Sequence, residues 1–232
     1  AARGVKAGDR VALLLGNRNE FVVTLYATAW LGAIGVPLSI REQTSGLAYM
    51  LQQCGATVLV HESDLIDRLP QVAEVPTLQH RISVGGVDAR WPHWLQHGPL
   101  PAVATVAEED TACILYTSGT TGNAKGVVHT HRSLLDRAKA GADFDKLTSR
   151  EEVLAYLPPA WIGQNIFSYA QWLCCGYVVN CPESAATVNI DLKEIGPTYY
   201  FAPPRVFEGM LTSVMIRMED AGSFKRGMFH HF

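Results

Sequence analysis

The sequence predicts an α/β fold in which largely parallel β-sheets are covered by helices. Short apolar runs of strand length alternate with longer segments of helix length along most of the chain. This alternation is typical of parallel sheets, because a parallel strand needs a long crossover connection, usually a helix. Some of the runs, such as residues 11–15, are continuously apolar, which indicates strands buried on both faces.

The first cycle of the pattern lies near the start of the chain. A turn at Gly8 and Asp9 precedes the apolar run 11–15, and Asn19 is expected to cap a helix over about residues 20–31. The run 34–38 then returns as a strand, which completes a strand–helix–strand unit.

Later cycles repeat this order with clear stop signals. A second helix is expected from Ser45 to Cys54 with Gly55 at its end, and the pair Pro158 and Pro159 should break the strand that begins at residue 153. The other expected strands are 57–61, 81–84, 113–116, 127–130, 153–157, 177–180 and 198–201. The other expected helices are 64–72, 133–142, 163–174, 190–195 and 205–220, with residues 91–107 as an irregular connection.

Composition excludes several classes of partner. The 232 residues are 48% hydrophobic and carry a formal net charge of -3, which gives a sizeable core and no basic surplus for nucleic acid. The five cysteines are odd in number and lack zinc-site spacing, so we expect a reducing compartment, and we expect no secretory leader. Two charge-poor windows, 21–40 and 153–183, contain Gly, Pro and polar residues, so they predict no transmembrane segment. We expect a cytoplasmic protein, and the sequence leaves peripheral contact with a membrane open.

A glycine- and hydroxyl-rich segment between two expected strands is the main functional signal. The segment is Tyr116-Thr117-Ser118-Gly119-Thr120-Thr121-Gly122-Asn123-Ala124-Lys125-Gly126. Its glycines allow close backbone approach, its hydroxyls can donate to oxyanions, and its lysine supplies positive charge, so it predicts a polyphosphate site. It is not the common P-loop, because Lys125 stands three residues after Gly122 and Gly126 follows it. The structural alternative is a flexible, hydroxyl-rich surface loop.

The segment resembles the phosphate-binding motif of the adenylate-forming (AMP-binding) superfamily, whose pattern is Tyr-Thr-Ser-Gly-Thr-Thr-Gly-x-Pro-Lys-Gly. Ala124 is the one departure, at the position where proline is most common. The likeness covers nearly the whole chain. It implies that the chain is an incomplete large N-terminal domain spanning residues 1–232.

The resemblance implies roles for particular residues. Lys125 would be catalytic and would also bind ATP, together with the loop residues Thr117, Ser118, Gly119, Thr120, Thr121 and Gly122. Trp161 stands where the family usually has a histidine beside the acid, so it would line the substrate pocket, although packing in the core is an equal alternative. No metal ligands can be assigned, although the family uses Mg²⁺.

The resemblance also implies an activity. Residues 197–208 are similar to a stretch of long-chain fatty acyl-CoA synthetases, so we expect a ligase that joins a fatty acid to coenzyme A with ATP. The adenine motif, the ribose aspartate and the lysine of the small C-terminal domain cannot be placed in this sequence, so the fragment is expected to be inactive alone. Two alternatives stay open: adenylation of another acid for a carrier-protein thiol, and a non-catalytic nucleotide-binding remnant. Chain length of the acid, thiol acceptor and oligomeric state are not predicted.

Overall fold

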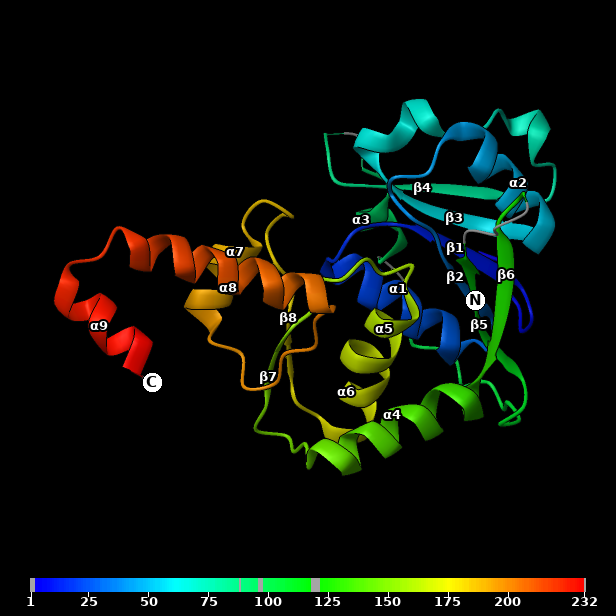
Figure 1. Ribbon diagram of the computed structural model, residues 1–232. Helices are drawn as coiled ribbons and strands as arrows, with labels where there is room; N and C mark the ends of the chain where they lie inside the picture. The colour runs from blue at the N-terminus through cyan, green and yellow to red at the C-terminus, as the bar shows by residue number, and fades with distance from the viewer. Residues whose placement is uncertain (1–2, 88, 96–97, 118–121, 232) are drawn as a thin grey trace. The chain divides into compact units, whose positions relative to one another are not determined.

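The computed structural model describes residues 3–87, 89–95, 98–117 and 122–231. The chain divides into two compact units, residues 1–198 and 199–232, and each is described by itself. Figure 1 shows the strands of the first unit and the helices around them. The strands are β1 (Arg10–Leu14), β2 (Ile34–Pro37), β3 (Ala56–Glu62), β4 (His80–Val84), β5 (Thr111–Thr117), β6 (Lys125–Thr130), β7 (Glu152–Leu154) and β8 (Val178–Asn180).

Helices join these strands in the order that the sequence predicts. The helices of the first unit are α1 (Asn19–Trp30), α2 (Thr44–Cys54), η1 (Ser63–Arg68), η2 (Val72–Glu74), α3 (Trp91–Trp94), α4 (His131–Asp145), α5 (Ile162–Gln164), η3 (Asn165–Ala170), α6 (Gln171–Cys175) and α7 (Val188–Ile195). The second unit contains α8 (Pro204–Glu219) and α9 (Ser223–His231).

The large sheet has the strand order β4-β3-β1-β2-β5-β6. The strands from β4 to β5 run parallel, and only β6 is antiparallel, paired with β5 as a hairpin. A second sheet of the described chain pairs β7 with β8 in parallel. The prediction of a largely parallel α/β fold is therefore confirmed.

Both faces of the sheet are buried at β1, as the continuous apolar run in this strand predicts, whereas the edge strand β6 is largely exposed. Ala12 and Leu14 point into a core shared with Leu51 of α2, whereas Leu13 points into a second core with Phe21 of α1. Successive side chains of a strand face opposite sides, so one strand supplies both cores. The central strands of the sheet are thus held between two helical layers.

Several local expectations differ from the structure, among them the irregular connection 91–107, in which Trp91–Trp94 form the short helix α3. Helix α1 begins at Asn19, with Arg18 rather than Asn19 at the N-cap and no side-chain cap bond. The expected helix 64–72 is two short 3₁₀ segments, η1 and η2. Residues 198–201 form no strand in the described chain, because only an isolated bridge at Tyr199 follows the bend at Thr198.

Candidate functional site

The strand pair β5–β6 holds the two ends of the glycine-rich segment. Thr117, the last residue of β5, lies opposite Lys125, the first residue of β6, in the antiparallel register. The pairing therefore places a residue with a hydroxyl directly opposite a residue with an ammonium, although the two are eight positions apart in the sequence. The predicted site residues Ser118, Gly119, Thr120 and Thr121 lie outside the described residues.

Tyr116, the first residue of the glycine-rich segment, is held by contacts with helix α2. The Tyr116 hydroxyl donates to the carbonyl oxygen of Met50 in α2 at 3.1 Å. Burial raises the pKa of Tyr116, so its hydroxyl stays protonated and remains a donor. Ala124, which stands where the family pattern usually has proline, is partly buried and packs against the core on the α2 side of the sheet.

Strand direction places the segment at the carboxyl edge of the sheet. β5 runs parallel to β2, β2 to β1 and β1 to β3, so all four strands end at the same edge. β1 and β3 are neighbours in the sheet. The connection that follows β1 leads to β2 on one side of this pair, and the connection that follows β3 leads to β4 on the opposite side. The β1–β3 boundary is therefore a topological switch point, where ligands bind in open α/β sheets.

A cavity of about 800 Å³ occupies this edge of the sheet. Its walls come from the loops that follow β1, β2, β3, β7 and β8. The residues that line it include Asn17, Arg18, Glu20, Arg41, Glu62 and Trp161. The described residues of the glycine-rich segment do not line it, so the segment and the cavity share an edge of the sheet without forming one pocket in the described part of the chain.

Trp161 lies on the wall of this cavity. It is 54% exposed and follows the pair Pro158 and Pro159 in the loop between β7 and α5, and both prolines also line the cavity. The alternative that Trp161 packs in the core does not hold, because its side chain remains half accessible.

Ion pairs give the cavity a mixed charge. The Arg18 guanidinium lies 2.9 Å from a carboxylate oxygen of Glu20 and 3.9 Å from one of Glu62, and the hydrogen bond from Arg18 lowers the pKa of Glu20. Glu62 also accepts from the backbone N–H of Gly16 at 2.8 Å, which ties the end of β3 to the loop after β1. Arg18, Glu20 and Glu62 thus form a connected polar group on the wall of the cavity.

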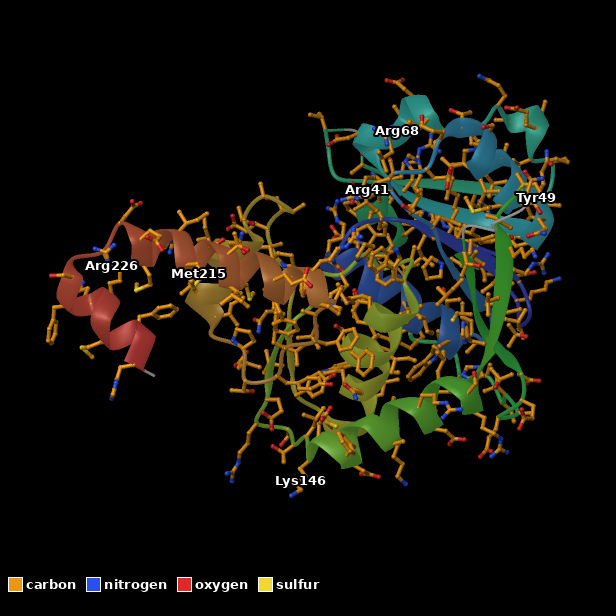
Figure 2. The ribbon with its side chains drawn as sticks, viewed as in Figure 1. Arg41, Tyr49, Arg68, Lys146, Met215 and Arg226 are labelled. Carbon is orange, nitrogen blue, oxygen red and sulfur yellow. The ribbon has the colours of Figure 1, made fainter. Side chains whose placement is uncertain are left out.

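Two more arginines lie at the same edge. Arg68 donates to the carbonyl oxygen of Ile40 at 3.0 Å and so lies next to the loop that carries Arg41 (Figure 2). Sequence reasoning missed Arg18 and Arg41 because they belong to no motif that was recognised. Their position just after expected strands of a parallel sheet was the available signal.

The described residues contain no group of three or more His, Cys, Asp or Glu side chains that could hold a metal ion. The same part of the chain has no helix with the length and apolar character needed to cross a membrane.

Comparison with known proteins identifies the family. The sequence profile described as AMP-binding enzyme matches residues 1–229, and the chain belongs to this family. It is 34% identical over 161 residues to "Long-chain-fatty-acid--CoA ligase FadD13" of Mycobacterium tuberculosis, covering 68% of this chain and 31% of that protein. It is also 34% identical over 223 residues to "3-hydroxybenzoate--CoA/4-hydroxybenzoate--CoA ligase" of Thauera aromatica, covering 90% of this chain and 42% of that protein.

Solved structures show the same fold. A long-chain-fatty-acid-CoA ligase (FadD1) from Archaeoglobus fulgidus superposes with a TM-score of 0.81 at 23% identity, covering 95% of this chain and 44% of that chain. The N-terminal domain of FACL13 from Mycobacterium tuberculosis superposes with a TM-score of 0.71 at 29% identity, covering 83% of this chain and 49% of that domain's chain. The present chain thus spans between 31% and 42% of the two curated relatives named above.

Proposed function

We propose that residues 1–232 are part of the large N-terminal domain of an enzyme that activates a carboxylic acid with ATP and transfers the acyl group to coenzyme A. The observation that carries this proposal is the glycine-rich segment, whose ends meet as Thr117 and Lys125 at the carboxyl edge of the parallel sheet. Membership of the AMP-binding enzyme family supports it. The rest of the large domain and a small C-terminal domain would supply the adenine, ribose and second lysine contacts.

The first step joins two anions, so it needs positive charge and alignment. A carboxylate oxygen would attack the α-phosphorus of ATP as the bond to pyrophosphate breaks. In this proposal Lys125 contacts the departing phosphates, while the hydroxyls and backbone of residues 117–121 bind the β and γ phosphates. Mg²⁺, when bound with the nucleotide, supplies further positive charge to the phosphates.

In the second step the thiol sulfur of coenzyme A would attack the acyl carbon, and AMP would leave. Trp161 would line the site for the acid, because it is half exposed on the wall of the cavity at the same edge of the sheet. We assign a long-chain fatty acid as the substrate. The relative named as a fatty-acid ligase and the similarity of residues 197–208 to long-chain synthetases support this choice. An aromatic acid is the competing substrate, because a relative of the same identity is named for hydroxybenzoate.

We place the enzyme in the cytoplasm, where ATP and coenzyme A are available, with peripheral contact at a membrane as a source of fatty acid. Sequencing the coding DNA on both sides of this segment is the first step of the test. An open frame that continues into an adenine-contact motif and a terminal-domain lysine supports the proposal. A stop codon directly after Phe232 would favour a nucleotide-binding remnant.

The activity test is acid-dependent exchange of pyrophosphate into ATP by the full-length enzyme. Lys125→Ala should slow exchange by about 10²–10³-fold, the usual cost of losing one charge-stabilising contact in the transition state. Lys139→Ala, which removes an exposed lysine on α4, is the matched control and should leave exchange unchanged. Equal rates in the two variants would refute the role of Lys125. Transfer to a carrier protein but not to coenzyme A would select the alternative acceptor.

A further inference from the structure

The loop that carries Trp161 is held by side-chain amides. This loop, residues 156–161, connects β7 to α5 and contains two prolines, which have no backbone N–H to donate. Its carbonyl oxygens can still accept hydrogen bonds from other parts of the molecule. Three of these carbonyls accept hydrogen bonds from two asparagine side chains.

Asn17 holds the start of the loop. Its Nδ2 donates to the carbonyl oxygen of Leu157 at 2.9 Å, and its Oδ1 accepts from the hydroxyl of Tyr169 at 3.1 Å. A backbone carbonyl can only accept, so the amide orientation of Asn17 is determined by these two partners. Tyr169 is 2% exposed, and burial raises its pKa, so the hydroxyl keeps the proton that it donates.

Asn165 holds the other end of the loop. Its Nδ2 donates to the carbonyl oxygens of Pro159 and Trp161, both at 2.8 Å, and the side chain is buried. Within the loop, the Trp161 N–H donates to the carbonyl oxygen of Pro158 at 2.9 Å. The backbone of Trp161 is thus fixed although its side chain is half exposed.

Asn165 and Tyr169 belong to the same unusual element, the π-helix η3. Two of its carbonyl oxygens, those of Phe167 and Tyr169, accept from the hydroxyls of Tyr177 at 2.8 Å and Tyr26 at 2.9 Å. A π-helix within an α-helix is rare and frequently lies at a functional site. Here it carries Asn165, which bonds to the Trp161 loop directly, and Tyr169, whose hydroxyl bonds to Asn17.

We propose that Asn17, held by Tyr169, is a positioning residue that fixes the Trp161 loop and thereby sets the affinity for the acid. Asn17 lies in the loop after β1, and its amide joins that loop to the one after β7. The inference rests on the proposed function, because it takes the Trp161 loop as a wall of the acid site. It assigns Asn17 no part in the chemical steps.

The test compares Asn17→Asp and Tyr169→Phe with Tyr177→Phe in the full-length enzyme. Asn17→Asp keeps an oxygen for Tyr169 but removes the donor to Leu157, and Tyr169→Phe removes only the hydroxyl. Tyr177→Phe is the matched control, because it also removes a hydroxyl that bonds to η3 but has no hydrogen bond to Asn17. Hydrogen exchange followed by mass spectrometry of the peptide covering residues 155–163 reports the order of the loop without any assay of activity.

Asn17→Asp and Tyr169→Phe should each speed exchange in this peptide about three- to tenfold, as expected for loss of one hydrogen bond, and Tyr177→Phe should not. The same two variants should raise KM for the acid several-fold while KM for ATP and kcat stay within twofold. Equal exchange in all three variants, or equal increases of both KM values, would overturn the inference. Failure of the proposed function would look different: Trp161→Ala would then leave KM for the acid unchanged, whatever the exchange result for Asn17.

Discussion

At the scale of single residues, Gly126 shows why a side chain at the end of the glycine-rich segment would be tightly packed. A Cβ atom at this position would lie 3.0 Å from Cγ2 of Ile114 and 3.4 Å from Cζ of Tyr116. Its φ is not in the left-handed region, so the requirement for glycine comes from close packing against β5. The family motif therefore includes a glycine whose role is structural, next to a lysine whose proposed role is chemical.

Gly126→Ala should lower the free energy of unfolding by about 1–3 kcal/mol, the usual cost of overpacking. Gly209→Ala is a suitable control, because a Cβ atom there meets nothing within 4 Å in helix α8. That substitution should be neutral or stabilise by up to about 1 kcal/mol, because alanine favours the helix. Urea denaturation of both variants checks the prediction, and equal stabilities would contradict it.

Residues of the candidate site can be predicted from the sequence only where they belong to one contiguous motif. Thr117 and Lys125 are predicted from one short segment, and the strand pairing places them opposite each other, while their role in binding stays a prediction. Asn17 and Arg18 were not found, because their importance depends on loops that meet at the carboxyl edge after folding. Their position just after expected strands of a parallel sheet is a local signal, but it does not show which of these loops lie together after folding.

At the scale of elements, the segment from α5 to α6 was predicted as one apolar helix, and the structure adds the π-helix within it. The periodicity of the sequence is too coarse to distinguish π from α geometry over six residues. The hydroxyls of Tyr26 and Tyr177, which bond to carbonyls of the π-helix, come from other elements. Hydrogen bonds from other elements therefore accompany this deviation, whereas the strand–helix alternation can be read from the local sequence.

This segment also contains a buried side-chain amide that has no hydrogen-bond partner among the described residues. Gln171 is 0% exposed, and neither Nε2 nor Oε1 forms a hydrogen bond with any part of the chain that the structure describes. An unsatisfied buried polar group costs about 1–3 kcal/mol, and methionine has a similar shape without that cost. Gln171→Met should therefore raise the free energy of unfolding by about that amount.

Gln53→Met provides the control for this change on an exposed helix surface. Its Nε2 donates to the hydroxyl of Tyr49 at 2.9 Å in contact with solvent, so stability should change by less than about 0.5 kcal/mol. Denaturation with urea, with far-ultraviolet circular dichroism as the signal, measures both variants. A loss of stability in Gln171→Met would mean that the amide is satisfied in solution, by water or by residues outside the described part.

At the scale of the whole molecule, the two units differ in how much they bury. Both hydrophobic cores consist of residues of the first unit, from Val5 to Cys181. None of the residues of α8 in the second unit is buried, and Leu211 and Ile216 are each 60% exposed. The free energy of folding should therefore come from the first unit.

A chain that ends at Thr198 should accordingly unfold in one cooperative transition with a midpoint within about 4 °C of that of residues 1–232, a shift equivalent to about 1 kcal/mol for a domain of this size. A chain that ends at Leu147 is the control. It lacks Ala155 and Tyr169, which pack with Phe21 in the second core, so it should lose its cooperative transition. Scanning calorimetry of the three chains distinguishes these outcomes. A large fall in the midpoint for the chain ending at Thr198 would show that residues 199–232 stabilise the first unit. The free energy of folding would then not come from the first unit alone.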